Sequence, residues 1–203
     1  MSPGATFERV YTELRRMLTE GELPPGSPIE PAAIGRQIAS SITPVRDALH
    51  RLTGERLVEA PNHNGFRVPL PTEAGLRDLY SWRARLLALA TRNLRAGPAA
   101  TRERLSVDQM DPGEAMDRLF LEIAGASGSA EHVAAIAQLN GRLAPLRRAE
   151  FRIFDNLVEE HEGIRDRLLD GDGRSLTSLL ERYHRRRLRA VSDILAAVYS
   201  DRR

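Results

Sequence analysis

From residue 72 onward the chain repeats apolar residues at three- and four-residue spacing with few interruptions, as in TEAGLRDLYSWRARLLALATRNL. This spacing places the apolar side chains on one face of a helix, whereas a half-buried strand would alternate every second residue. Gly97-Pro98 ends the first helix. Further helices are predicted at 113–125, 130–152, 156–169 and 174–199. The pattern therefore predicts an all-α bundle for residues 71–203.

Residues 1–70 show a different pattern that is dense in turn residues. An amphipathic helix is predicted at Phe7–Leu18, and the segment GELPPGSPIEP then ends it with prolines and glycines. A short second helix is predicted at Ala32–Ile38, and Val45 and Leu49 belong to the buried stripe of a third.

The third helix has a marked start, with Thr43 predicted as its N-cap and Pro44 as its first helical residue. After this helix, Leu57-Val58 and Phe66-Arg67-Val68 flank a polar Asn-His-Asn-Gly turn, which is typical of a hairpin. Three helices followed by a hairpin make a winged helix-turn-helix. The predicted fold class is therefore mainly α, with a winged helix-turn-helix domain at 1–70 and a helical bundle at 71–203.

Composition narrows the class of protein. There is no cysteine, which removes disulfides and thiolate metal sites and suits a reducing cytoplasm. No apolar run approaches the ~20 residues needed to span a bilayer, so we expect a cytoplasmic protein without a membrane partner. Net charge is only +2, and all 30 basic residues are arginine. A nucleic-acid site would therefore depend on a local patch rather than on overall charge.

The segment SSITPVRDALHRL gathers groups suited to DNA at the start of the third helix. The second helix of a helix-turn-helix enters the major groove with its N-terminal residues against bases and phosphates. Ser41 and Thr43 offer hydroxyls, Arg46 can bind phosphate or guanine, and His50 lies on the same face. The alternative is that Ser41 and Thr43 only cap the helix and that Arg46 is a solvated surface residue.

The predicted wing adds a second set of DNA-contacting candidates. Asn62, His63 and Asn64 form its polar turn and can reach an adjacent groove or the backbone. Gly65 follows them directly. We therefore expect double-stranded operator DNA as the partner of the first domain.

Three stretches resemble the GntR family of bacterial transcription regulators: LRRMLTEGELPPGSPI, SSITPVRDALHRLTGERLVEAPNHNGFRVPLP and LRDLYSWRARL. The resemblance implies that Ser41, Thr43 and Arg46 contact DNA, and that Gly65 belongs to the wing. The family's usual helix start is Ser-Arg-Thr-Pro-Val-Arg, in which the first arginine often recognises a guanine. Ile42 stands at that position here, which puts the family's usual operator core in doubt.

The second domain resembles the effector domain of the FadR-like branch, often called FCD, on helix order and a few polar positions. That branch commonly holds a divalent metal such as zinc or nickel on one Asp and three His. By resemblance, Asp117, His161 and His184 would be the ligands, while Leu121 stands where the fourth ligand, a histidine, is usual. The alternative is that both histidines are hydrogen-bonded residues of a metal-free pocket.

Other polar residues complete the predicted effector pocket. The resemblance implies that Arg83 holds the pocket together or binds a carboxylate effector. Asn140 interrupts the apolar face of AAIAQLNGRLAPL, which indicates either a pocket position or surface exposure. His132 and the run Arg185-Arg186-Arg187 are interpreted as solvated.

These features together favour a metabolite-responsive, homodimeric transcription regulator that is not an enzyme and binds a pseudo-palindromic operator. One alternative is a metal-dependent helical enzyme that uses Asp117, His161 and His184 as a two-His-one-carboxylate site. Against the enzyme, no second base or nucleophile forms a recognisable arrangement, and the winged domain stays unexplained. The other alternative, motivated by Ile42, is an interaction module that has lost DNA binding.

Overall fold

The computed structural model describes residues 3–61, 65–94, 105 and 111–200. The chain divides into two compact units, the first ending at Pro71 and the second beginning at Thr72. Each unit has its own apolar core. In the described part of the chain, no helix is long and apolar enough to cross a membrane.

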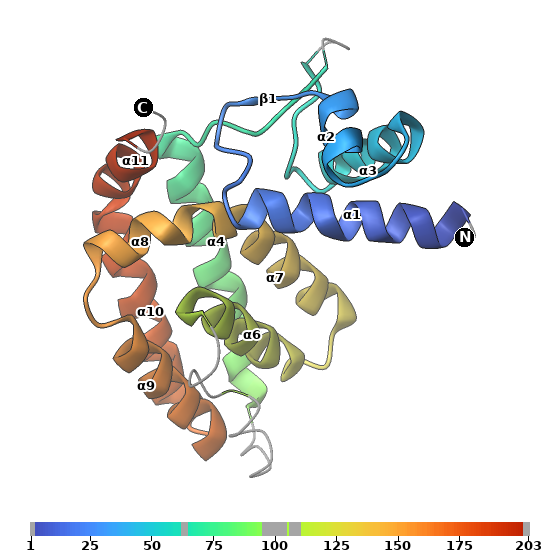
Figure 1. Ribbon diagram of the computed structural model, residues 1–203. Helices are drawn as coiled ribbons and strands as arrows, with labels where there is room; N and C mark the ends of the chain where they lie inside the picture. Colours follow the sequence, from blue (N-terminus) through green and yellow to red (C-terminus); the bar gives the residue numbers. More distant parts are fainter. Residues whose placement is uncertain (1–2, 62–64, 95–104, 106–110, 201–203) are drawn as a thin grey trace. The chain divides into compact units, whose positions relative to one another are not determined.

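The first unit packs three helices beside a small sheet (Figure 1). Its elements in chain order are α1 (Pro3–Thr19), β1 (Pro28–Ile29), α2 (Pro31–Gln37), α3 (Ile42–Gly54) and β2 (Phe66–Arg67). Val10 and Leu14 of α1 are fully buried together with Val45 and Leu49 of α3. The amphipathic spacing seen in the sequence therefore builds the core that holds α3 in place.

The sheet of this unit is smaller than the predicted hairpin. β1 pairs antiparallel with β2, with Ile29 opposite Phe66. On the other side of β2, Glu59 and Arg67 exchange two backbone hydrogen bonds of 2.9 Å. The predicted strand at Leu57-Val58 is therefore reduced to a single bridge at Glu59. The strand on the other side of β2 is β1, which lies in the linker before α2.

Helix α3 begins earlier than predicted. Ser41, with φ −74° and ψ 164°, is its N-cap, so Thr43 is not the cap. Pro44 consequently lies in the middle of the first turn rather than at its first position. The first four N–H groups of a helix have no intrahelical acceptor, so a proline there removes no hydrogen bond. The helix can thus start before Thr43 without losing a hydrogen bond.

The turn between α2 and α3 depends on a close backbone approach. The N–H of Ser40 donates to the carbonyl of Gly35 at 2.8 Å, and Ala39 has a φ of +51°. A Cβ at position 35 would lie 2.8 Å from the carbonyl oxygen of Ser40. Only glycine fits there without a backbone shift.

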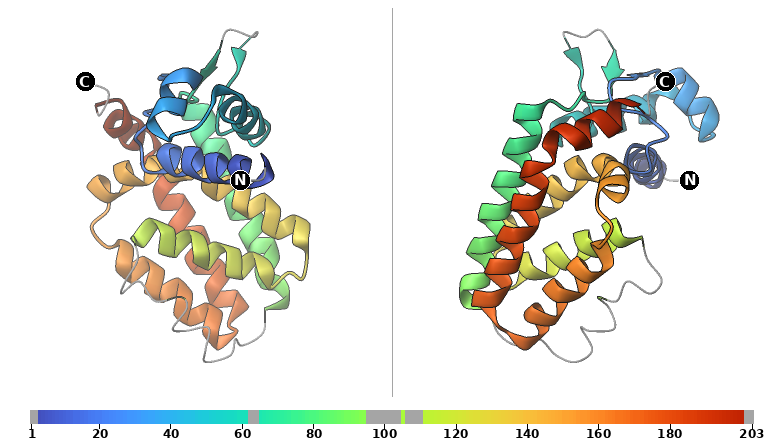
Figure 2. Two further views of the ribbon diagram at one scale, coloured as in Figure 1. Left: turned by 45° about the vertical axis from the view of Figure 1, so that its right-hand side comes forward. Right: turned by 90° about the vertical axis from the view of Figure 1, so that its left-hand side faces the viewer.

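The second unit is a bundle of helices, as predicted. Its elements are α4 (Glu73–Ala90), η2 (Thr91–Asn93), α6 (Pro112–Gly125), α7 (Ala130–Leu143), η3 (Ala144–Leu146), α8 (Arg147–Ile153), α9 (Leu157–Asp170), α10 (Gly173–Arg189) and α11 (Val191–Ser200). Figure 2 shows α4 running alongside α10, and these two helices make the most extensive helix contact of the bundle.

Two predicted helices are each divided in the structure. The segment 130–152 is interrupted at Pro145, which lacks the N–H that a helix needs, and becomes α7, η3 and α8. The segment 174–199 is divided at Ala190, whose N–H donates to the carbonyls of both Arg186 and Arg187. No proline or glycine marks that second break.

Candidate functional site

The N-terminal end of α3 presents an exposed polar surface. Val45 and Leu49 point into the core, while Ser41, Thr43 and Arg46 are exposed. Ile42 is also on this surface, with half of its side chain accessible. The helical period thus separates a buried face from a free face at the residues predicted to meet DNA.

Two arginines of α3 have different environments. Arg51 forms an ion pair with Glu8 of α1 and lies 4.1 Å above the ring of Tyr11, so it links α3 to α1. Arg46 makes no hydrogen bond or ion pair with the residues that the structure describes. Its guanidinium is therefore available to an external partner, whereas that of Arg51 is committed to the fold.

The predicted wing is described in part. His50 of α3 is exposed and its ring meets that of Phe66 edge-on, at 5.0 Å between centroids. Gly65 is exposed, with a φ of +82° that suits glycine. Asn62, His63 and Asn64 lie outside the described residues. His50 therefore connects the free face of α3 to the β2 edge of the wing.

Inside the bundle, Arg83 of α4 is fully buried, and no acidic side chain in the described part of the chain forms an ion pair with it. Its Nε donates to Nε2 of His184 at 3.2 Å, and its guanidinium lies 4.7 Å from the ring centroid of Phe120. Neither Nη1 nor Nη2 has a hydrogen-bond partner among the described residues. Burial lowers the pKa of Arg83, although an arginine side chain stays protonated in proteins. This is a desolvated cation whose two outer nitrogens are free.

Arg83 also determines which ring nitrogen of His184, on α10, carries the proton. Because a guanidinium can only donate, Nε2 of His184 must be the acceptor, and Nδ1–H donates to the carbonyl of Leu180 at 2.7 Å. Burial first, and then the nearby Arg83 charge, lower the pKa of His184 well below its ordinary value. His184 is therefore a neutral ring with both nitrogens engaged.

The remaining predicted pocket residues surround α6. The Asp117 carboxylate forms an ion pair with Arg147 of α8. Asn140 donates from Nδ2 to the backbone carbonyl of Asp117 at 3.0 Å, while its buried Oδ1 accepts from none of the described residues. His161 of α9 is fully buried; its ring lies close to the Ala115 backbone of α6 but makes no hydrogen bond of good geometry with the described residues. Burial is the main cause that lowers its pKa.

These residues do not fit a metal ion. Among the described residues no group of three Asp, Glu or His side chains could hold one. The Asp117 carboxylate is neutralised by Arg147, and the Nε2 lone pair of His184 accepts from Arg83. Leu121 packs against the apolar core of the bundle. Among the described residues these side chains are therefore engaged with one another, and the predicted metal and the enzyme that would use it stay predictions.

The first domain has a recognised family. The family model described as "Bacterial regulatory proteins, gntR family" matches residues 6–68. Residues 6–68 form a GntR-type winged helix-turn-helix domain. This match spans α1 to β2 and thus includes the free face of α3 described above.

Two curated proteins are similar to part of this chain. An HTH-type transcriptional regulator of Bacillus subtilis, YdhC, is 27% identical over 88 residues, which cover 43% of this chain and 39% of YdhC. The HTH-type transcriptional repressor GlaR of Escherichia coli is 30% identical over 79 residues, covering 39% of this chain and 36% of GlaR. These matches therefore span less than half the length of either relative.

The solved structures resemble the chain over nearly its whole length. A GntR regulator from Rhodococcus sp. RHA1 has a TM-score of 0.79 at 20% identity and covers 95% of this chain and 99% of its own. Escherichia coli McbR/YncC has a TM-score of 0.69 at 23% identity and covers 98% and 99%. These likenesses confirm the predicted fold class, a GntR-type domain followed by a helical domain.

Sequence reasoning missed the main charged network inside the helical domain. Arg187, predicted as solvated, is only 1% exposed. Its Nε donates to Glu150 and its Nη1 to Glu160, both at 2.9 Å, and Glu150 also accepts from the hydroxyl of Tyr80 at 2.6 Å. Helical period could have revealed this position, because Arg187 follows Leu176, Leu180 and Tyr183 on the buried stripe of α10.

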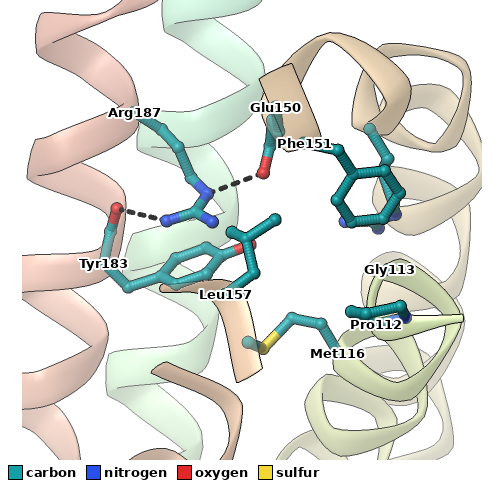
Figure 3. A pocket seen from close by; sticks show the side chains of 9 residues that line it. Pro112, Gly113, Met116, Glu150, Phe151, Leu157, Tyr183 and Arg187 are labelled. Atoms are coloured by element: carbon teal, nitrogen blue, oxygen red, sulfur yellow. Dashed lines mark hydrogen bonds and ion pairs between the residues drawn. The ribbon is translucent and has the colours of Figure 1, made fainter. Parts of the chain in front are cut away.

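A small pocket opens beside this network (Figure 3). Arg187, Glu150 and Tyr183 form one side, and the Arg187 guanidinium lies 3.4 Å from the ring centroid of Tyr183. Figure 3 shows Met116 and Phe151 on the opposite side. Arg147 also lines the pocket, and its buried Nε donates to none of the residues that the structure describes. The pocket therefore connects the surface of the bundle to the Asp117–Arg147 ion pair.

Proposed function

We propose that this protein is a GntR-type transcription regulator that binds operator DNA as a homodimer and responds to a small effector held in its helical domain. The observation that carries the proposal is the free face of α3, where Arg46 is exposed and has no partner among the described residues. The family match of residues 6–68 and the regulator names of both curated relatives support the same function.

The geometry of α3 supports insertion into a major groove. The residues at its start are short or flexible, and the backbone N–H groups of a helix N-terminus favour phosphate. Arg46 can then reach a phosphate or a guanine edge. Ile42 is exposed beside it, so an apolar group would meet the DNA where related proteins usually present an arginine.

The test is a mobility-shift titration with DNA from upstream of the protein's own gene. Arg46→Ala should weaken binding by about 1–3 kcal/mol with little change in thermal stability, because it removes a charge-assisted contact from an exposed side chain. Arg15→Ala is the matched control, since Arg15 is an exposed arginine on the neighbouring helix α1.

Two results would contradict the assignment of α3. One is equal affinity for wild type and Arg46→Ala. The other is equal loss in Arg46→Ala and Arg15→Ala, which would indicate non-specific attraction to positive charge. Restoring the family's residue with Ile42→Arg should act in the opposite direction and strengthen binding to guanine-containing sites.

The bundle interior supports the effector part of the proposal. Arg83 has two free nitrogens in the planar fork that matches a carboxylate, and a buried cation without a counter-charge is costly. Asn140 and His161 add further unpartnered polar atoms around α6. We assign a small carboxylate as effector, bound without a metal in an FCD-like bundle. Its binding would change the geometry of the dimer, and with it the affinity for DNA.

A further inference from the structure

Ile42 is an apolar side chain on a surface that is otherwise polar. It is the first residue of α3, and half of its side chain is accessible. It does not join the apolar core of the first unit, which Val45 and Leu49 of the same helix enter. Among the described residues of this unit, the one other large apolar side chain with comparable exposure is Leu70, which lies outside α3. Packing within the unit therefore leaves the exposure of Ile42 unexplained.

Ile42 lies on the face of α3 that is free to meet DNA. Residues four apart are neighbours on the surface of a helix, so Ile42, Arg46 and His50 form a row along α3, and all three are exposed. Neighbours in this row are about 6 Å apart along the axis, at a rise of about 1.5 Å per residue. The N-cap, Ser41, makes no side-chain cap bond, so backbone N–H groups at this helix end stay available to a phosphate. A helix end held at a phosphate brings the side chain of its first residue against the base edges.

The chemistry of the major groove decides which base suits an isoleucine. Guanine, adenine and cytosine present hydrogen-bond donors and acceptors there, whereas thymine adds a C5 methyl group. Isoleucine has no side-chain donor or acceptor, so packing Ile42 on a purine edge would remove that edge from water without replacing its hydrogen bonds, which costs free energy. Packing it on a thymine methyl removes two apolar groups from water, which is favourable. The contact therefore favours thymine.

We propose that Ile42 is a specificity-determining residue that recognises a thymine in each operator half-site through the C5 methyl group of that base. The proposal deepens the DNA binding of the proposed function and rests on it. It makes the contact depend on one methyl group, which chemical synthesis can remove from DNA or add to it without changing the hydrogen-bonding groups of the base.

The test removes the thymine methyl from a bound duplex. The full-length wild type selects its preferred duplex from a randomised library, and each thymine is then replaced in turn by deoxyuridine, which lacks only the methyl group. At a thymine in each half-site, replacement should weaken binding about fourfold, which corresponds to about 0.8 kcal/mol for one buried methyl group. Ile42→Ala should bind the thymine and deoxyuridine duplexes equally.

The probe 5-methylcytosine gives the reciprocal test. Replacing the T·A pair at the contact by C·G should weaken wild-type binding. Methylating that cytosine at C5 should restore part of the loss, because the methyl group returns to the same place in the groove. The same methylation should not change the affinity of Ile42→Ala.

Control variants make the assignment specific. Ile42→Val keeps a branched apolar side chain and should keep most of the discrimination between thymine and deoxyuridine. Leu70→Ala removes an exposed apolar side chain away from α3 and should discriminate as wild type does. Thr43→Ser removes the methyl group of the neighbouring exposed threonine and should also discriminate as wild type does. Because Ile42 is outside the core cluster, Ile42→Ala should melt close to the wild-type temperature.

The outcomes separate this inference from the proposed function. A wild type that selects no duplex from the library would overturn DNA binding itself, and this inference with it. A wild type that binds its selected duplex but tolerates deoxyuridine at every position would overturn the inference alone. Discrimination that survives in Ile42→Ala, or that is lost in Thr43→Ser, would assign the methyl contact to a residue other than Ile42.

Discussion

Arg83 is the residue whose environment demands the most explanation, because it buries a positive charge that no described acidic group neutralises. If a carboxylate provides the missing charge, sodium salts of acetate or succinate should raise the melting temperature at constant ionic strength. Arg83→Met, which keeps the length but removes the charge, should abolish that rise. Thermal scans with and without the salts measure it.

The neighbouring Arg85 supplies the control for this prediction. It lies on the same helix but is exposed, so Arg85→Met should keep the wild-type response to each salt. If Arg83→Met and wild type respond alike, the carboxylate binds elsewhere and the free nitrogens of Arg83 are satisfied by water.

His184 gives the protein a predictable dependence on pH. Its pKa is lowered in the folded state by burial and by Arg83. As pH falls below about 6.5, the unfolded chain binds a proton at this position and the folded chain does not, so the free energy of unfolding falls by up to about 1.4 kcal/mol per pH unit. His161 adds to the same trend, because its pKa is also lowered.

Replacing the titrating ring should flatten this dependence. His184→Gln keeps an acceptor for Arg83 and binds no proton. Urea unfolding at pH 7, 6 and 5 should therefore show a smaller loss of stability than in wild type. Identical slopes for the two proteins would mean that His184 takes up its proton in the folded state as readily as in the unfolded chain.

Among the elements, the turn between α2 and α3 is the most tightly specified. Gly35→Ala places a methyl group 2.8 Å from the carbonyl oxygen of Ser40, so the turn must open. We expect a loss of about 1–3 kcal/mol in stability, the usual cost of overpacking, and weaker DNA binding. Urea unfolding and a mobility shift measure the two effects.

A second glycine of the same domain tests whether this effect is local. Gly54 ends α3, and a Cβ there would meet nothing within 4 Å. Gly54→Ala should therefore be neutral or stabilise the helix by a few tenths of a kcal/mol, up to about 1. Equal destabilisation by both substitutions would show that the Gly35–Ser40 contact is not what limits the turn.

The elements were largely predictable because their signals are local. Apolar spacing located the helices, and prolines and glycines located most of their ends. The predicted start of α3 was wrong because the sequence around Thr43-Pro44 is compatible with a cap at either Ser41 or Thr43. Only the extended backbone at Ser41 distinguishes the two. The break at Ala190 has no local signal, since it follows from how the end of α10 is packed.

At the scale of the whole molecule, the bundle should not depend on a metal. Extensive dialysis against a chelator should leave the melting temperature unchanged, and elemental analysis should find no stoichiometric zinc or nickel. Leu121→His should not create a site, because Asp117 and His184 stay engaged by Arg147 and Arg83. Stoichiometric metal in the wild type would show that these two arginines release the ligands.

The bundle site was only partly predictable from sequence, because its chemistry lies in pairings between distant residues. Arg83, Asp117, Asn140, His161 and His184 are all in the interior or at its edge. The spacing of residues along the sequence does not show which arginine forms an ion pair with which acidic residue. The Asp117–Arg147 pair joins α6 to α8, and the Glu150–Arg187 pair joins α8 to α10, so each depends on the packing of whole helices.

Gly113, a buried residue in the first turn of α6, has a consequence for genetics. A side chain there would collide with the methylene stem of Arg147, whose guanidinium holds Asp117. An allele that adds one methyl group at codon 113 would therefore mimic an allele that removes the arginine at codon 147. In a screen for regulators that no longer respond to their signal, the two codons would fall into one phenotypic class, although neither changes an acidic residue.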